Sequence, residues 1–431
     1  MSLSRFALML AGAIIVFAII GVWAGAPLAG AWRWPAALLI AFVVWERIRL
    51  TQAFTLHRQI ASTLALGLPI SYTLTISNTG KSPLRLETQV DYPDRIEGDN
   101  SLQSWQLQAG ASQSRQFPLT PLKLGPALLG RLYLKQLGVF GLCWWTRAID
   151  DSTGFNVEPV RLDQVATVPS LTALGNRHRH KAGNGLELLD LRDYRHGDPL
   201  RSIDWKASAR RGKPITRRFE REQRLEIIVL IDCGRGSRLQ CGQLDRLHNY
   251  VNVAAKLAEF TVLQGDHIGC LAYAQQIVDR APVAGGMMAV NRIRQLLGHL
   301  SAGHEEANAL NAALEARRLL KHRGLVVFLT GIEQPEAAAQ LIQAGQLLAP
   351  QHQVLVGCLE DPAIGDILKR SARQWQDPYR HFAALEYQKG RQATCLQLQR
   401  HGVAVAPATA RHLDQQVLAY YQNQRGTIAG A

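Results

Sequence analysis

One short stretch carries charged residues in a spacing that some metal-dependent nucleases use. Asp198 lies six residues before Asp204, which is followed directly by Trp205 and Lys206. An acidic pair can hold divalent metal ions, and a lysine two positions after an aspartate can meet a phosphate backbone. Against this reading, Asp198 stands in a Gly-Asp-Pro turn, and no further acidic ligand is evident. A nuclease or other nucleic-acid-binding protein is therefore kept as the alternative hypothesis.

The same stretch belongs to a basic segment in which cations and acids are interleaved. Residues 177–224 hold 14 Lys/Arg and 7 Asp/Glu, so 14 − 7 gives +7 of the chain's formal charge of +14. Charges that leave water need hydrogen-bonded partners, and arginine pairs with carboxylates or stacks on aromatic rings. The segment predicts either a network at a domain junction or a partner-binding surface, formed by Arg192, Tyr194, Arg195, Asp198, Arg201, Asp204, Trp205, Lys206 and Arg210.

A third candidate is Asp232, which follows the continuous apolar run 225–231. A carboxylate at the carboxyl end of a buried strand commonly faces a ligand or a divalent cation. Here Gly234 and Gly236 follow, and glycine supplies no side-chain oxygen to a cation. The favoured interpretation is that Asp232 caps a helix start or pairs with an arginine, at a degenerate site that holds no metal.

These candidates need elements to position them, and strands and helices alternate after residue 225. Segments with apolar residues three and four apart lie between short apolar runs, as in Leu244, Leu247, Val251 and Ala254. Such alternation predicts an α/β fold with a mostly parallel, doubly wound sheet over 225–431. The predicted strands are 225–231, 268–273, 325–329 and 353–359.

Residues 51–170 change to short alternating runs that are broken by turn residues. This pattern predicts a small β-sandwich, with strands at 70–76, 84–90, 116–119 and 128–134. An apolar corner at 138–142 is followed by Trp144 and Trp145. The favoured interpretation is that it packs the β domain, and the alternative is that it touches a lipid surface.

Residues 1–50 predict a transmembrane helical hairpin. Phe6–Ala24 carries no charge and can cross a hydrocarbon layer of about 30 Å, and a second span is expected from Leu28 to Trp45. Arg47 and Arg49 follow the second span, so the positive-inside rule puts the bulk of the chain in the cytoplasm, under the inner membrane. A signal peptide is the competing interpretation of the first span.

The composition narrows the class of protein further. The six cysteines are scattered, with no zinc-finger spacing, which favours a reducing compartment over a disulfide scaffold. The basic balance permits contact with nucleic acid or anionic lipid. The favoured interpretation is a basic cytoplasmic face beside a membrane.

The basic segment carries a family resemblance. The run ELLDLRDYRHGDPLRSIDWKASARRGKP, residues 187–214, resembles the signature of the domain of unknown function 58 family. The resemblance implies a membrane hairpin, a β-rich segment and a von Willebrand factor type A-like domain. It also implies a role beside MoxR-type AAA+ ATPases, with which family members are thought to act as membrane-bound adaptors or assembly factors.

The loop after residue 231 resembles the first loop of a von Willebrand factor type A domain, whose metal site reads Asp-x-Ser-x-Ser. Asp232 matches, but glycines stand at both serine places. Asn308 occupies the threonine place, and Thr330-Gly331 stands where Ser-Asp would end a later strand. The resemblance therefore implies a degenerate metal site.

Together these observations predict a non-enzymatic, membrane-anchored adaptor that needs no cofactor. Its expected partners are the membrane and a MoxR-type AAA+ ATPase or its client, and no nucleic acid is expected. The predicted organisation is a hairpin at 1–50, a β-sandwich-like domain at 51–170, the signature segment at 171–224 and the α/β domain at 225–431.

Overall fold

The computed structural model describes most of the chain, and the chain divides into two compact units, Met1–Glu158 and Pro159–Ala431. The described residues are 2–24, 30–49, 54–150, 153–162, 182–196, 200–220, 224–333, 335–371 and 373–428.

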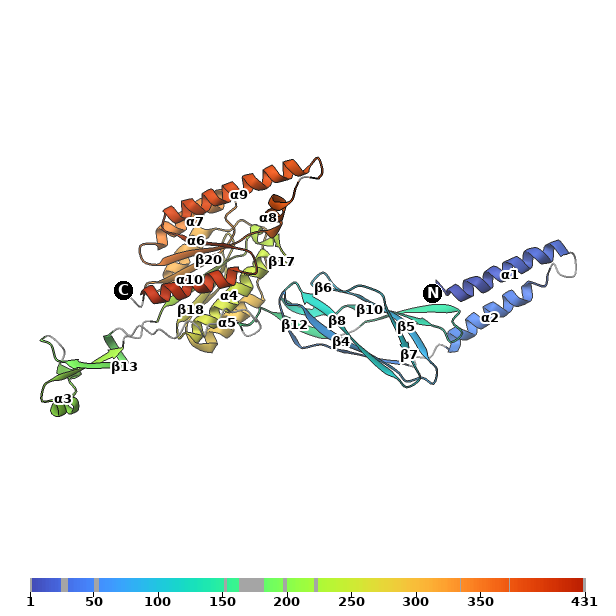
Figure 1. Cartoon of the computed structure of the whole chain (residues 1–431), viewed down its shortest axis with the longest axis horizontal. Helices are drawn as coiled ribbons and strands as arrows, with labels where there is room; N and C mark the ends of the chain where they lie inside the picture. The colour runs from blue at the N-terminus through green and yellow to red at the C-terminus, as the bar shows by residue number, and fades with distance from the viewer. Residues whose placement is uncertain are drawn as a thin grey trace. The chain divides into compact units, whose positions relative to one another are not determined.

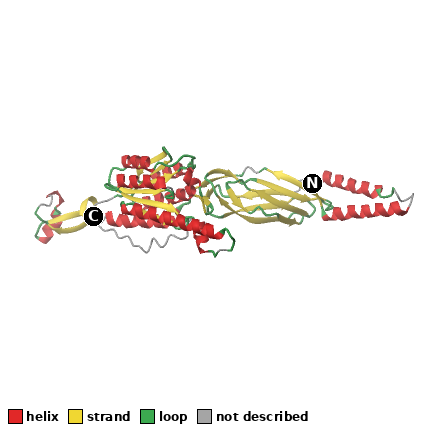
Figure 2. Ribbon diagram, turned by 90° about the horizontal axis from the view of Figure 1, so that it is seen from above, coloured by secondary structure: helices red, strands yellow, loops and turns green. Residues whose placement is uncertain are grey.

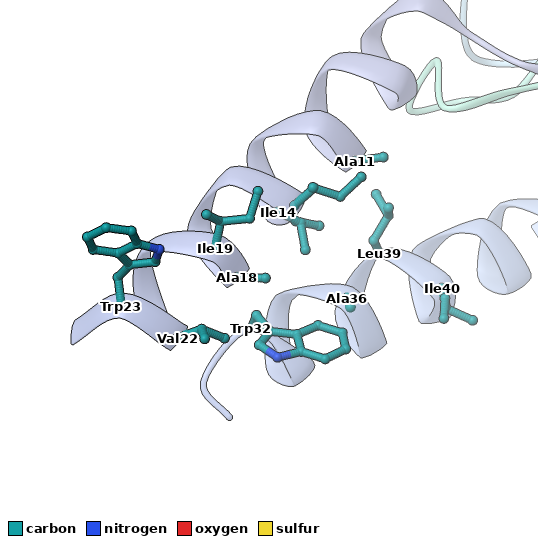
Figure 3. A pocket seen from close by; sticks show the side chains of 11 residues that line it. Ala11, Ile14, Ala18, Ile19, Val22, Trp23, Trp32, Ala36, Leu39 and Ile40 are labelled. Atoms are coloured by element: carbon teal, nitrogen blue, oxygen red, sulfur yellow. The ribbon is translucent and has the colours of Figure 1, made fainter. Parts of the chain in front are cut away.

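Two helices open the first unit, α1 (Arg5–Ala24) and α2 (Arg33–Arg49). Within the described residues, α1 is the helix long and apolar enough to cross a membrane, with a mean hydropathy of 2.6 over Arg5–Trp23. The predicted first apolar helix is therefore confirmed. The second predicted span is helical from Arg33, and its crossing of a membrane stays a prediction. The two helices line one groove of about 700 Å³ with apolar side chains alone (Figure 3).

The rest of the first unit is built from β-strands (Figure 1). A five-stranded sheet has the order β1-β11-β10-β5-β7, a four-stranded sheet has the order β2-β4-β8-β6, and a three-stranded sheet has the order β3-β12-β9. The strands are β1 (Ser2–Leu3), β2 (Phe54–Gln59), β3 (Thr63–Ala65), β4 (Ile70–Asn78), β5 (Leu84–Asp91), β6 (Ile96–Gly98), β7 (Gln103–Leu107), β8 (Ser112–Pro121), β9 (Gly125–Leu128), β10 (Arg131–Leu137), β11 (Cys143–Ile149) and β12 (Gly154–Glu158).

Alternating burial explains these strands. Along β4 and β5 every second side chain is buried, as the period of an extended strand requires. The five- and four-stranded sheets meet where the rings of Trp105 and Phe117 lie 6.4 Å apart. One prediction was wrong in detail, because the expected strand 128–134 is broken at Gly130. That residue adopts φ 95°, outside the extended region, and β9 ends at Leu128 while β10 begins at Arg131.

The second unit contains a six-stranded sheet of order β19-β18-β15-β20-β21-β22. All neighbouring strands are parallel except β19, which runs antiparallel to β18. This is the doubly wound order in which the sequence of strands reverses between β15 and β20. The predicted alternation is present, while the edge strands β19 and β22 were not predicted. The strands are β15 (Glu226–Asp232), β18 (His267–Tyr273), β19 (Ile277–Ala284), β20 (Gly324–Leu329), β21 (Gln353–Leu359) and β22 (Ala404–Ala408).

Helices cover this sheet (Figures 1 and 2). Helices α4, α5 and α10 form one group, in which Phe260 and Tyr421 meet edge to face at 5.8 Å. Helices α6, α7 and α9 bury apolar residues in a common core with the strands, including Ala312, Leu341 and Leu398. The helices are α4 (Arg246–Leu263), α5 (Gly286–Gly298), α6 (Ala309–Leu319), α7 (Pro335–Leu348), α8 (Pro362–Lys369), α9 (Asp377–Arg400) and α10 (Leu413–Ile428). Short elements η3 (Arg235–Arg238), β16 (Gln240–Cys241) and β17 (Leu244–Asp245) join β15 to α4.

The basic segment forms a hairpin of its own. Strands β13 (Ala182–Asp193) and β14 (Ile215–Glu220) pair antiparallel with two shifts of register. Between them lie η2 (Leu200–Ser202) and α3 (Trp205–Arg211). The sequence did not predict this hairpin.

Candidate functional site

Asp204 pins the short helix α3 to the hairpin. Its carboxylate accepts a hydrogen bond from the Ala207 N–H at 3.0 Å, which is the geometry of a helix N-cap. Its other oxygen pairs with Arg217 Nε at 3.1 Å. These two contacts, with Ala207 the larger, lower the pKa of Asp204. Gly212 ends the helix in a left-handed conformation, φ 69°.

A second ion pair closes the hairpin at its strands. Lys213 Nζ lies 2.7 Å from Asp193 Oδ2, and this contact lowers the pKa of Asp193. Both side chains are half exposed, so the pair fixes geometry more than it adds stability. Of the four residues in these two ion pairs, the sequence singled out Asp204 alone.

Trp205 points into solvent. It is the first residue of α3 and is 71% exposed, and Lys206 and Arg210 on the same short helix are also exposed. The other candidates differ in exposure. Arg195 is exposed, Arg192 and Tyr194 are half-buried, Arg201 lies in η2, and Asp198 lies outside the described residues.

A second cluster lies at the carboxyl end of the sheet, where β15 and β20 are neighbours. Asp232 Oδ2 accepts a hydrogen bond from Thr330 Oγ1 at 2.6 Å, and its Oδ1 accepts from the Gly234 N–H at 2.8 Å. The Asp232 backbone carbonyl accepts from Ser237 Oγ at 2.7 Å. Burial raises the pKa of Asp232, against the lowering effect of Thr330 and Gly234. Both carboxylate oxygens therefore have protein donors.

Packing explains the glycine at position 234, but not the one at position 236, where a Cβ would meet nothing within 4 Å. A Cβ at Gly234 would lie 2.8 Å from the Ala307 backbone nitrogen, so no side chain fits there without a shift of the backbone. Asn308, at the place of the expected threonine, instead caps α6 by accepting from the Asn311 N–H at 3.0 Å. Two of the positions that a metal site would use therefore serve the packing and capping of loops.

A buried cation completes this cluster. Arg246, the first residue of α4, pairs with Glu333 at 2.8 Å, and both side chains are largely buried. Tyr387 of α9 donates to the same carboxylate at 3.2 Å. The Arg246 charge also lowers the pKa of Asp232. Among the residues that the structure describes, no group of three or more His, Cys, Asp or Glu side chains is placed to hold a metal ion.

Sequence reasoning missed the Arg246–Glu333 pair. Its signal was an arginine at the start of an amphipathic helix and a glutamate three residues after Thr330 at a strand end. The two lie 87 positions apart in the chain. Only the strand order brings them together.

Comparison with known proteins supports part of the resemblance. The model of a family described as "Protein of unknown function DUF58" matches residues 190–374, from the β13–β14 hairpin to the turn before α9. The resemblance predicted from residues 187–214 is confirmed over that range. No curated protein matches the chain.

Three solved structures resemble parts of the chain weakly. Salmonella alpha-2-macroglobulin reacted with methylamine is 16% identical, with a TM-score of 0.21 over 25% of this chain and 7% of that one. A native Escherichia coli alpha-2-macroglobulin fragment is 17% identical, with a TM-score of 0.21 over 25% of this chain and 17% of that one. A FixG-related protein from Vibrio parahaemolyticus is 11% identical, with a TM-score of 0.18 over 25% of this chain and 98% of that one. The chain thus spans under a fifth of the alpha-2-macroglobulin chains, and these likenesses carry no argument about function.

Proposed function

We propose that this protein is a membrane-anchored, non-enzymatic adaptor or assembly factor, and that a MoxR-type AAA+ ATPase or its client is its partner. The observation that carries the proposal is the exposed Trp205 on α3, held by Asp204 and accompanied by Lys206 and Arg210. Tryptophan and arginine are the residue types that most often dominate binding energy at interfaces. A fixed helix that presents them to solvent fits docking better than chemistry.

The membrane anchor of this proposal is the α1–α2 hairpin in the inner membrane. In support, β1 pairs with β11 immediately before α1 begins, and Glu46 near the end of α2 binds the turn between β10 and β11. Both ends of the helix pair therefore lie against the same sheet, as a chain that enters and returns through a membrane requires. The groove between the helices is lined almost wholly by apolar atoms, which suits hydrocarbon (Figure 3). The bulk of the chain would then be cytoplasmic.

The α/β unit of this proposal is a von Willebrand factor type A-like domain that does not use a metal. The doubly wound order and the place of Asp232 at the end of β15 support the assignment. The two protein donors on its carboxylate and the nearby Arg246 support metal-independent docking. The nuclease alternative gains no support at Asp204, whose carboxylate is engaged by Ala207 and Arg217.

The test is co-purification of the full chain with a MoxR-type ATPase from the same cells. Trp205→Ala and Arg195→Ala are expected to lose most of the recovered ATPase. Trp375→Ala is the matched control, because that tryptophan is 77% exposed and lies outside the hairpin. Equal recovery by all folded variants would show that the hairpin does not bind this partner.

A further inference from the structure

The turn between β10 and β11 is apolar, and some of its side chains are exposed. Residues 136–145 carry no charge, and they include Val139, which is 63% exposed, and Phe140, which is partly exposed. Exposed apolar side chains that adjoin a larger apolar surface can mark a contact with a membrane or a partner.

The turn lies level with the apolar part of α2. The Phe140 ring stacks on Trp45 at 5.0 Å and meets Phe42 at 5.4 Å. Phe42 is about one helical turn before Glu46 and therefore lies on the apolar side of the charged helix end, which contains Arg47 and Arg49. If α2 crosses a bilayer, Phe140 lies within the layer that aromatic side chains prefer at the membrane surface.

The packing beneath the turn joins it firmly to both helices. Leu142 and Cys143 form a small buried core with Ala7, and Leu10, Leu39 and Val43 pack against it. Arg47 lies over the Trp145 ring at 5.4 Å, so the first cation after the apolar stretch is also held at this joint. The turn therefore keeps its depth relative to α1 and α2.

The backbone of the turn has internal hydrogen-bond partners. Glu46 is fully buried, and its two oxygens accept from the N–H groups of Phe140 at 2.9 Å and Cys143 at 3.2 Å. The N–H of Gly138 donates to the Cys143 carbonyl, and the N–H of Gly141 donates to the Gly138 carbonyl, each at 2.9 Å. Backbone that enters a water-poor layer needs such partners, because lipid supplies none.

Ser4 satisfies the acceptors on the same turn. Its hydroxyl donates to the Gly141 carbonyl at 2.5 Å, and its N–H donates to the Leu142 carbonyl at 2.9 Å. A Cβ at Gly138 would clash with the Glu46 carboxyl group, so a larger residue there would have to displace that side chain. The buried Glu46 carboxylate thus fills the space beneath the turn, and it also accepts hydrogen bonds from the backbone of the turn.

We propose that the turn formed by residues 138–142 inserts Val139 and Phe140 into the interfacial layer of the lipid bilayer, as a third membrane contact beside α1 and α2. The inference rests on the proposed membrane anchoring. The occupant of this surface is the lipid boundary, because the turn continues the apolar surface of α2. Glu46 is the positioning residue that makes the insertion possible.

Depth-dependent fluorescence quenching tests this directly. The full chain with Cys395→Ser, which removes the one half-buried thiol, receives a single Val139→Cys label and is reconstituted in phosphatidylcholine–phosphatidylglycerol vesicles. Matched labels are placed at Leu128→Cys, which is 56% exposed on β9, and at Ile19→Cys in α1. The quenchers are lipids with a nitroxide at a shallow or a deep acyl position, and iodide in the water.

The expected result is strong quenching at position 139 by the shallow nitroxide, at position 19 by the deep nitroxide, and at position 128 by iodide alone. Glu46→Gln is expected to reduce lipid quenching at 139 while position 19 stays unchanged. A label at 139 that behaves like the one at 128, with 19 still quenched, would overturn the inserted turn and leave the membrane anchor standing. Shielding of 139 from both lipid and iodide would show a protein occupant instead. Loss of lipid quenching at 19 would overturn both proposals.

Discussion

In two hairpins of this chain, a carboxylate accepts hydrogen bonds from backbone N–H groups, but the side chains around the two carboxylates differ. In the β10–β11 turn, Glu46 accepts from two backbone N–H groups, and in the β13–β14 hairpin, Asp204 accepts from the Ala207 N–H. Each carboxylate fixes a segment that exposes an aromatic side chain, Phe140 in one and Trp205 in the other. The difference lies in what surrounds the aromatic ring.

Glu46 is buried and reaches the turn from another element, and the residues around Phe140 are apolar. Asp204 caps its own helix and pairs with Arg217, and the cations Lys206 and Arg210 are exposed on the same helix as Trp205. The first arrangement supplies acceptors to backbone N–H groups packed against α2, whereas the second leaves the charged side chains beside Trp205 exposed to water. In both hairpins a charge-assisted hydrogen bond from backbone N–H to carboxylate fixes the segment that carries the aromatic side chain.

The largest effect is expected from Glu46→Ala. The change removes the acceptor of the buried Cys143 N–H, at a cost of about 1–3 kcal/mol, and also that of the partly buried Phe140 N–H. Thermal or denaturant unfolding of the full chain in micelles should show this loss. Glu97→Ala, at an exposed site, is the control and should change stability little. A loss of stability no larger than that of the control would contradict the role of Glu46 in holding the β10–β11 turn.

A smaller loss is expected from Gly138→Ala. The new methyl group would lie 2.0 Å from the Glu46 carboxyl carbon, and overpacking of this kind costs about 1–3 kcal/mol. Gly12→Ala, where nothing lies within 4 Å, is the matched control in the same unit. The same unfolding measurement separates them, and equal midpoints would show that Glu46 can move away freely.

Asp204→Ala should act locally rather than globally. Loss of the N-cap is expected to speed amide exchange in α3 by roughly an order of magnitude, with the α/β unit unchanged. Because its partners lower the pKa of Asp204, the stabilisation is present above the unfolded pKa and is lost as pH falls through the folded value. Protection of α3 should therefore hold at neutral pH and fall below about pH 4. Protection that does not change with pH in the native chain would contradict the role of Asp204.

The smallest effect on stability is expected from Trp205→Ala. An exposed side chain changes the free energy of unfolding by no more than about 0.5 kcal/mol. Differential scanning fluorimetry should give the same midpoint as the native chain. A clear loss of stability would mean that Trp205 packs against the protein, and would turn the hairpin into a structural element.

The sequence predicts the regular parts of this molecule well. Continuous apolar runs locate α1 and the buried strands, such as β15, because both kinds of element exclude polar side chains. The edge strand β19 was not predicted from the sequence. Its consecutive residues Val278, Asp279 and Arg280 are exposed, so it lacks the alternation of buried and exposed side chains that marks a strand. The β13–β14 hairpin was not predicted either, because its many charged residues interrupt the alternation of apolar and polar residues by which a strand is predicted.

The roles of single acids are the hardest to predict. Glu46 stands at the end of an apolar helix and suggests only the edge of a membrane span, while its partners lie 94 and 97 positions away. Arg246 and Glu333 are likewise joined only by the strand order. Local patterns carry information about caps and turns, and long-range pairs need the fold.

The most direct test of the adaptor proposal is site-specific photo-cross-linking in native membranes. A photoreactive amino acid replaces Trp205 in one variant and Trp375 in a second, since both tryptophans are exposed on the second unit. The proposal predicts a cross-link from position 205 to a MoxR-type AAA+ ATPase or its bound client, and none from position 375. Cross-links of equal yield from both positions, or none from position 205 while the ATPase is present, would contradict it.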